Sequence, residues 1–272
     1  MPLDRTAEDL LAAVQASPRA VAAHDKDAWV GLFVDNAAVH DPYGAREHIG
    51  REAISRFYNV FIAPNTIAFR VERDLVAGRT VVRDLHIETT MSTGATVTVP
   101  MHLRYDLIES ADGWRIARLA AHWELAVMIR RLLGTGPSGM LAGTKLGPQL
   151  IAELGVGGAM GMMRGLRGVG TTGKRVVGRL FGAAAAGDLA GVRDLLGARA
   201  AVELPAGRPV DAAGFAEFAR DIRWEKMIAA GRTVSASVRI GAARGVAFVD
   251  FAADEPRIVA VTVFLDDPDL AR

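Results

Sequence analysis

The sequence predicts an α+β fold, a curved antiparallel sheet wrapped around helices, in two copies of which the second is shorter. Three features of the 272 residues lead to this prediction. The first half begins with helical spacing and then changes to long β-rich segments. The second half repeats the opening pattern of the first, and a stretch rich in glycine and methionine separates the two. Helices followed by a run of strands are typical of α+β domains rather than of βαβ units.

Three segments near the start have apolar residues at helical spacing. In the first, residues 10–22, Pro18 is expected to break or kink the helix. The second follows Asp25, and both Asp25 and Asp27 are suitable N-caps for it. The third is Arg51–Phe61. Together these segments predict three helices before the sheet.

Extended structure is predicted around and after the third helix. Residues 37–40 are short and extended, and Asp41-Pro42-Tyr43-Gly44 is a strong turn signal. From residue 67 the chain becomes β-rich, with short polar or glycine-containing breaks between the segments. The predicted long strands are Ile67–Val76, Thr80–Thr90, Ala95–Glu109 and Trp114–Val127.

The middle of the chain differs from an ordinary linker. Residues 130–174 contain many glycines and four methionines, whereas flexible linkers are usually polar. One interpretation is a pair of short, glycine-broken helices that cover a domain or a cavity mouth. The alternatives are a partly ordered connector and a membrane-surface segment. The expected divisions are residues 1–128, 129–174 and 175–272.

The second half repeats the first with a shift of 163 residues. Residues 22–44 align without gaps on 185–207. The matching pairs are Asp25/Asp188, Leu32/Leu195, Ala38/Ala201, Val39/Val202, Pro42/Pro205 and Gly44/Gly207. A helix over Asp211–Asp221 and strands near Thr233–Ile240, Gly245–Ala252 and Arg257–Leu265 are predicted to follow. Such internal duplication predicts two domains of one fold.

The composition excludes several classes of function. The 32 Lys and Arg nearly balance the 31 Asp and Glu, so a net charge of +1 gives no general attraction to nucleic acid. The absence of cysteine excludes disulfides and thiolate sites. The start lacks the pattern of a signal peptide, and no apolar run is long enough for a spanning helix. We therefore expect a cytoplasmic protein without integral membrane association.

No metal or cofactor is expected either. The six histidines lack the close spacing of metal ligands. Residues 168–175 approach a phosphate loop, but Arg175 stands where Ser or Thr would hold magnesium, and no strand precedes the loop.

Two neighbouring motifs carry a family resemblance. The segment LFVDNAAVHDPYG, residues 32–44, is followed six residues later by REAISRFY, residues 51–58. This pattern resembles the nuclear-transport-factor-2-like superfamily, which includes ketosteroid isomerases, SnoaL-type polyketide cyclases and limonene epoxide hydrolases. The best local match is to ketosteroid isomerase. The resemblance spans about 120 residues and implies a cone-shaped, cystatin-like α+β roll with an internal cavity.

The resemblance to ketosteroid isomerase implies a catalytic role for Asp41. Asp41 falls on the family's general base, which moves a proton next to a carbonyl group. In that family a Tyr and a protonated Asp donate hydrogen bonds to the substrate oxygen. These two donors fall on Ser17 and Met101, which cannot fully replace them. We therefore predict Tyr58 and His122 as substitute polar groups. The alternative is that Asp41 only forms the turn before Pro42.

Strand parity and the resemblance suggest which further residues contact the substrate. If Met101 faces the cavity, His102 and Arg104 face outward, since side chains alternate along a strand. In the last strand, His122 and Arg118 are preferred as the polar cavity residues. The expected substrate-binding residues are Tyr43, Phe57, Met101, Ser17 and Arg118.

Three functional hypotheses follow. In the first, the domain-one cavity binds and transforms a small lipophilic molecule, such as a steroid or polyketide, as an isomerase or a related lyase or cyclase. In the second, it binds such a molecule without catalysis. In the third, the fold serves as a structural module that forms a homodimer through its sheets. The second copy has Leu204 at the position of Asp41 and is expected to be non-catalytic.

Overall fold

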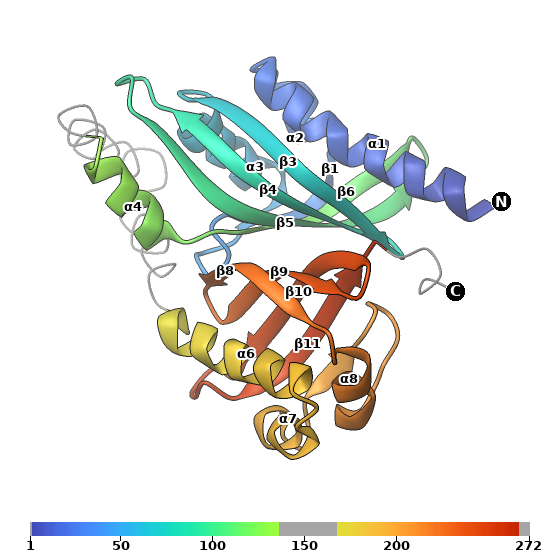
Figure 1. Cartoon of the computed structure of the whole chain (residues 1–272). Helices are drawn as coiled ribbons and strands as arrows, with labels where there is room; N and C mark the ends of the chain where they lie inside the picture. The colour runs from blue at the N-terminus through green and yellow to red at the C-terminus, as the bar shows by residue number, and fades with distance from the viewer. Residues whose placement is uncertain (1, 136–167, 267–272) are drawn as a thin grey trace. The chain divides into compact units, whose positions relative to one another are not determined.

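The computed structural model describes residues 2–135 and 168–266, which fold into two compact units (Figure 1). Unit one comprises Met1–Asp74 and Arg79–Leu166, and unit two comprises Leu75–Gly78 and Arg167–Arg272. Each unit has its own sheet and its own helices, which confirms the α+β class. Most of the expected 129–174 segment lies outside the described residues.

Helices begin unit one and also end its described part. They are α1 (Pro2–Ala22), α2 (Lys26–Gly31), α3 (Gly50–Phe57), the π-helix η1 (Tyr58–Ile62) and α4 (Leu125–Leu133). Pro18 lies inside α1, so the expected break is not observed. The helix continues past Pro18 because its inner face stays buried on both sides, through Val14 and Val21.

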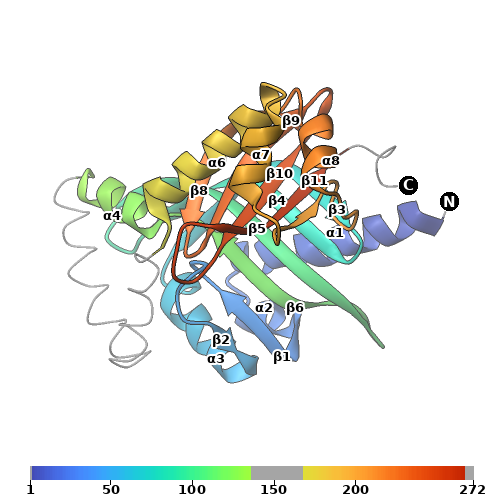
Figure 2. The same ribbon diagram turned by 90° about the horizontal axis from the view of Figure 1, so that it is seen from below.

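The sheet of unit one has six strands (Figures 1 and 2). They are β1 (Phe33–His40), β2 (His48–Ile49), β3 (Thr66–Ala77), β4 (Thr80–Thr90), β5 (Thr96–Ser110) and β6 (Gly113–His122). Their order is β2-β1-β6-β5-β4-β3. Because β1 runs parallel to β6, the sheet is mixed and not purely antiparallel as expected. The last strand ends at His122 because α4 begins three residues later.

Unit two has the same order of elements in shorter form. It contains α6 (Gly170–Ala185), α7 (Leu189–Leu196), β7 (Ala201–Glu203), α8 (Ala212–Phe218), β8 (Arg223–Ala230), β9 (Thr233–Ile240), β10 (Ala243–Phe251) and β11 (Ile258–Leu265). The strand order β7-β11-β10-β9-β8 equals that of unit one without β2. Strand β8 was not predicted from the sequence.

The two units share a helix cap at the predicted spacing of 163 residues. The Asp25 carboxylate accepts a hydrogen bond from the Ala28 N–H at 2.9 Å and caps α2. The Asp188 carboxylate accepts one from the Gly191 N–H, also at 2.9 Å, and caps α7. Of the two cap candidates in the sequence, Asp25 therefore caps the helix and Asp27 lies in its first turn.

Strand register repeats with the same shift. Val39 of β1 lies opposite Leu119 of β6 in a parallel pair, and Val202 of β7 lies opposite Val261 of β11 in the same way. Equal caps and equal register indicate that unit two is a second copy of the fold of unit one.

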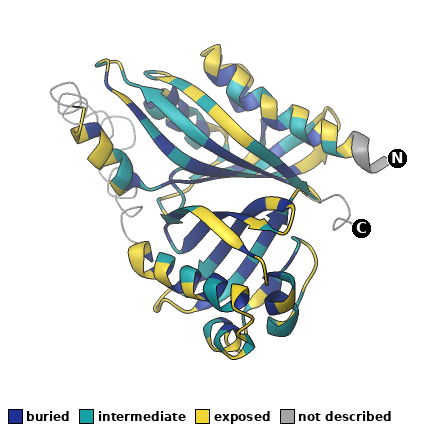
Figure 3. Cartoon of the chain, in the orientation of Figure 1, coloured by how far each residue is buried: buried dark blue, intermediate teal, exposed yellow. Residues whose placement is uncertain are grey.

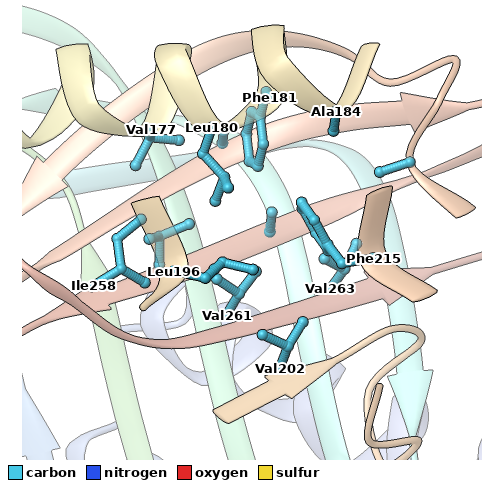
Figure 4. Close-up of a cluster of buried hydrophobic side chains, with 14 of the residues drawn as sticks. Val177, Leu180, Phe181, Ala184, Leu196, Val202, Phe215, Ile258, Val261 and Val263 are labelled. Carbon is cyan, nitrogen blue, oxygen red and sulfur yellow. The ribbon is translucent and has the colours of Figure 1, made fainter. Parts of the chain in front are cut away.

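Apolar side chains fill the interior of unit two. Leu204, at the position of Asp41, is fully buried, and so is Leu180, at the position of Ser17. Figure 4 shows Phe181 of α6 and Phe215 of α8 pointing into the same cluster as the valines of β11. Figure 3 shows the dark blue buried positions on these strands and helices. Unit two thus has a packed core where unit one places polar groups.

Candidate functional site

Unit one contains a cavity bounded by its sheet and its helices. The atom-free space is about 1190 Å³ with the open mouth included, enough for a small organic ligand. Its lining is mainly apolar and includes Phe57, Phe61, Val99, Met101, Leu103 and Leu119. The polar side chains in the lining are Ser17, Asp41, Asn65, Thr89 and Tyr105. A few polar groups in an apolar wall are typical of a ligand site.

Register decides which strand residues reach the cavity. Tyr105 of β5 lies opposite Leu119 of β6, and Leu103 lies opposite Ala121. Directly opposite residues in an antiparallel pair share one face of the sheet. The odd-numbered residues of β5 from Val97 to Tyr105 and Leu119 of β6 therefore face the cavity, and Trp123, just after β6, also lines it.

Asp41 follows the end of β1 and is held against β6. The Tyr43 N–H donates to the Ala121 carbonyl at 2.8 Å, which anchors the turn after Asp41. The Trp123 Nε1–H donates to Asp41 Oδ1 at 2.6 Å. Burial raises the pKa of Asp41 from 3.8 to about 6, although the Trp123 hydrogen bond favours the carboxylate and limits the rise. A base with a pKa in this range is well suited to proton transfer near neutral pH.

Two hydroxyl groups lie together in the same cavity. The Trp29 Nε1–H donates to Ser17 Oγ at 3.0 Å, and the Ser17 hydroxyl favours the ionised form of Tyr105, which limits the rise in its pKa. Burial raises the pKa of Tyr105 to about 12, so its hydroxyl stays protonated. Both residues line the cavity, and each carries an O–H group that can donate a hydrogen bond.

An ion pair lies next to this hydroxyl pair. Arg83 Nε is 2.7 Å from Asp74 Oδ1, and Arg83 Nη2 is 3.0 Å from Asp74 Oδ2. The Arg83 side chain is almost fully buried, and its positive charge counteracts the rise in the pKa of Tyr105. Bidentate pairs of this kind fix the guanidinium plane. The pair therefore fixes a positive charge near the phenol of Tyr105.

Four of the residues predicted from the sequence line the cavity: Asp41, Ser17, Phe57 and Met101. As expected from strand parity, Met101 faces inward, and His102 lies on the opposite face of β5. The other four, Tyr58, His122, Tyr43 and Arg118, are not part of the lining.

His122 lies on the other face of the sheet, opposite His102 in the register of β5 and β6. Its ring stacks on that of Tyr43, with 4.3 Å between centroids. Burial lowers the pKa of His122 well below its usual value. Arg118 is on the same face, where its Nε donates to Asp106 at 2.7 Å. His122 and Arg118 therefore face away from the cavity, and the expectation that they face it is wrong. The cavity is lined instead by the residues that follow them in the sequence, Trp123 and Leu119.

Tyr58 is buried beside the cavity and does not open into it. Its ring lies 5.6 Å from that of Trp29, and burial raises the pKa of its phenol. Its hydroxyl has no hydrogen-bond partner within the described residues. Tyr58 is therefore not one of the polar groups that line the cavity.

Trp123 and Tyr105 were not predicted as site residues. The sequence shows both only as members of strand faces: Tyr105 shares its face with Met101, and Trp123 shares its face with Leu119. The signal that would have identified them is the register between β5 and β6, which joins these two faces.

Other site types find no support in the described part of the chain. There, no three His, Asp or Glu side chains come together as metal ligands would. Over the same residues, none of the helices has the length and apolar character needed to cross a membrane.

Comparisons with known proteins agree with this architecture. The family model of the SnoaL-like domain matches residues 14–119, so this segment is a SnoaL-like domain with the nuclear-transport-factor-2-like fold. The match does not extend into unit two. No curated protein matches the chain.

Several solved structures resemble unit one. A Δ5-3-ketosteroid isomerase from a Mycobacterium species is 27% identical, with a TM-score of 0.40, covering 43% of this chain and 95% of its own. The protein RV0760c from Mycobacterium tuberculosis is 25% identical, with a TM-score of 0.40, covering 43% and 92%. That protein has also been solved in complex with estradiol-17beta-hemisuccinate, at the same identity and TM-score.

Proposed function

We propose that the cavity of unit one binds a small lipophilic carbonyl compound and that Asp41 moves a proton on it. The observation that carries this proposal is the carboxylate of Asp41, held by Trp123 in a mainly apolar cavity with a pKa of about 6. A turn-forming aspartate in water would have an ordinary pKa and no indole partner. Perturbed acidity in a cleft is a common property of catalytic groups.

The proposed reaction is the shift of a double bond in a β,γ-unsaturated ketone. The Asp41 carboxylate takes the proton from the carbon between the carbonyl and the double bond, which leaves a dienolate. The protonated hydroxyl of Tyr105, which lines the cavity with Ser17, donates a hydrogen bond to the dienolate oxygen. Protonated Asp41 then returns its proton to the γ-carbon. Atoms and charge balance, and no cofactor is required.

The second candidate is binding without catalysis. It is favoured by the identities of Ser17 and Met101, which stand where the resemblance to ketosteroid isomerase expects two strong donors. In that case the Asp41 carboxylate would orient a ligand hydroxyl group by accepting its hydrogen bond. Both candidates share the same lipophilic ligand class and the same cavity.

The test is ultraviolet absorbance of a Δ5-3-ketosteroid incubated with the full chain. Conjugation should appear with the wild type, and Asp41→Asn should lower the rate by about 10²–10⁴-fold, the usual contribution of a general base. Tyr105→Phe should lower it by about 10²-fold, since it removes a donor for the developing oxyanion. The rate of the wild type should rise with pH around pH 6, as Asp41 loses its proton.

Asp35→Asn is the matched control, because Asp35 is an exposed carboxylate on the same strand, β1. It should leave the rate unchanged. A negligible rate with the wild type, equal to that of Asp41→Asn, would exclude this catalysis. Thermal unfolding with the same steroid then separates the two candidates, since a ligand-dependent shift without turnover supports the binding module. Absence of both turnover and shift would remove both.

A further inference from the structure

Three arginines form a row across the sheet of unit two. Arg239 of β9 lies directly opposite Arg223 of β8 on one side and Arg244 of β10 on the other. Opposite residues share a face, so the three side chains leave the sheet on the same side. With strands about 4.8 Å apart, the three Cα atoms span about 10 Å.

The row borders two adjoining hollows on the surface. One is lined by Arg223, Arg239 and Arg244, and the other by Arg220, Arg223 and Arg239. All four arginines are exposed, and none of their guanidinium groups has an ion-pair partner within residues 168–266. Asp221 and Glu225 also line the hollows, so four positive charges meet two negative ones.

Such a row is unfavourable for the fold by itself. Like charges directly opposite each other in a sheet destabilise it, and here two such pairs follow in succession. An anion placed over the row would remove this repulsion. Guanidinium groups are planar forks that bind phosphate oxygens with paired hydrogen bonds. A single carboxylate would reach only one or two of the three.

We propose that the row Arg223–Arg239–Arg244 is a binding site for a multivalent oxyanion of the phosphate-ester or diphosphate class. The site consists of residues of unit two alone. It gives unit two, whose interior is filled by apolar side chains, a binding role of its own. The phosphate group can belong to a free metabolite or to a lipid headgroup.

Isothermal titration of the full chain with inorganic pyrophosphate tests the site. We expect binding to the wild type that weakens as salt is added, and affinity at least tenfold lower for Arg239→Gln, the central member of the row. Arg193→Gln is the matched control, because Arg193 is exposed on α7 of the same unit and outside both hollows. It should bind pyrophosphate like the wild type, and acetate should bind none of the three proteins detectably.

Thermal unfolding gives a second readout that also shows whether the variant folds. Without anion at low salt, Arg239→Gln should melt at a higher temperature than the wild type, because it relieves the repulsion. Pyrophosphate should raise the melting temperature of the wild type and of Arg193→Gln but not that of Arg239→Gln.

Co-sedimentation with vesicles distinguishes the two sources of phosphate. Phosphatidylcholine vesicles containing phosphatidic acid should retain the wild type, and not Arg239→Gln, if a lipid headgroup is the ligand. Pure phosphatidylcholine vesicles are the control. Binding to pyrophosphate alone supports a free metabolite, and binding to the acidic vesicles alone supports a lipid. Binding to neither, or equal binding of both by Arg239→Gln and Arg193→Gln, would overturn the proposal.

Discussion

Asp41 is a carboxylate at a buried position, where burial disfavours its charged form. Its carboxylate lies in the cavity lining and accepts a hydrogen bond from Trp123. Burial raises the pKa of Asp41 to about 6, above the 3.8 expected in the unfolded chain. The folded state therefore binds the proton more tightly. The stabilisation of the folded state by protonated Asp41 is therefore fully present at low pH. It is lost as the pH rises from about 4 to about 6.

Replacing Asp41 with Asn should therefore stabilise the protein at alkaline pH. A shift from 3.8 to about 6 corresponds to about 3 kcal/mol at full ionisation. The advantage of Asp41→Asn over the wild type should grow by about 2 kcal/mol between pH 4 and pH 8. Urea unfolding at the two pH values measures it.

Asp9→Asn is the control for this experiment, because it removes a carboxylate from an exposed position on α1. If both variants show the same dependence on pH, burial of Asp41 does not tune its acidity. A gain in stability with a loss of turnover is the pattern expected of a functional group that the fold tolerates at a cost.

At the scale of elements, the helix caps provide the clearest evidence of duplication. Asp25 and Asp188 cap α2 and α7 through equivalent hydrogen bonds. Substitution of an N-cap aspartate by alanine usually costs about 0.5–2 kcal/mol. We expect Asp25→Ala and Asp188→Ala each to lower the free energy of unfolding by about 1 kcal/mol in urea titrations.

Asp27→Ala serves as the control for the cap in unit one. Asp27 lies in the first turn of α2 and makes only the smaller, screened interaction with the helix dipole. Its substitution should cost clearly less than that of Asp25. Equal losses for Asp25→Ala and Asp27→Ala would mean that the cap hydrogen bond contributes little in solution.

Local patterns in the sequence predicted elements well and predicted their pairing poorly. The apolar alternation gave β4 and β9 with the correct limits, and the repeat placed Leu204 on Asp41. Which face of β6 meets the cavity depends on its register with β5, which one strand alone does not contain. For this reason His122 was preferred over Trp123. The parallel pairing of β1 with β6 was missed for the same reason, since it joins segments about 80 residues apart.

At the scale of the whole chain, the two copies of the fold differ in how their interiors are used. Unit one keeps an apolar cavity with Asp41 and Tyr105 in its wall. In unit two, Leu204 occupies the position that corresponds to Asp41. Val249 occupies the position that corresponds to Tyr105, as judged from the pairing of β10 with β11. Both are fully buried in a packed cluster. The two copies thus differ in the polar groups of their interiors, and the proposed oxyanion site of unit two lies on its surface.

This division predicts separate responses to the two classes of ligand. In hydrogen exchange measured by mass spectrometry on the full chain, a bound Δ5-3-ketosteroid should slow exchange in β5, β6 and α4, whose side chains line the cavity. Pyrophosphate should slow exchange in β8, β9 and β10, which carry the arginine row. Backbone protection follows ligand contact because binding stabilises the closed, hydrogen-bonded state of those strands. Arg239→Gln should abolish only the second pattern, and Asp41→Asn should leave that pattern intact. Protection by the steroid that appears in β8–β10 and not in β5 and β6 would contradict the assignment of the lipophilic ligand to unit one.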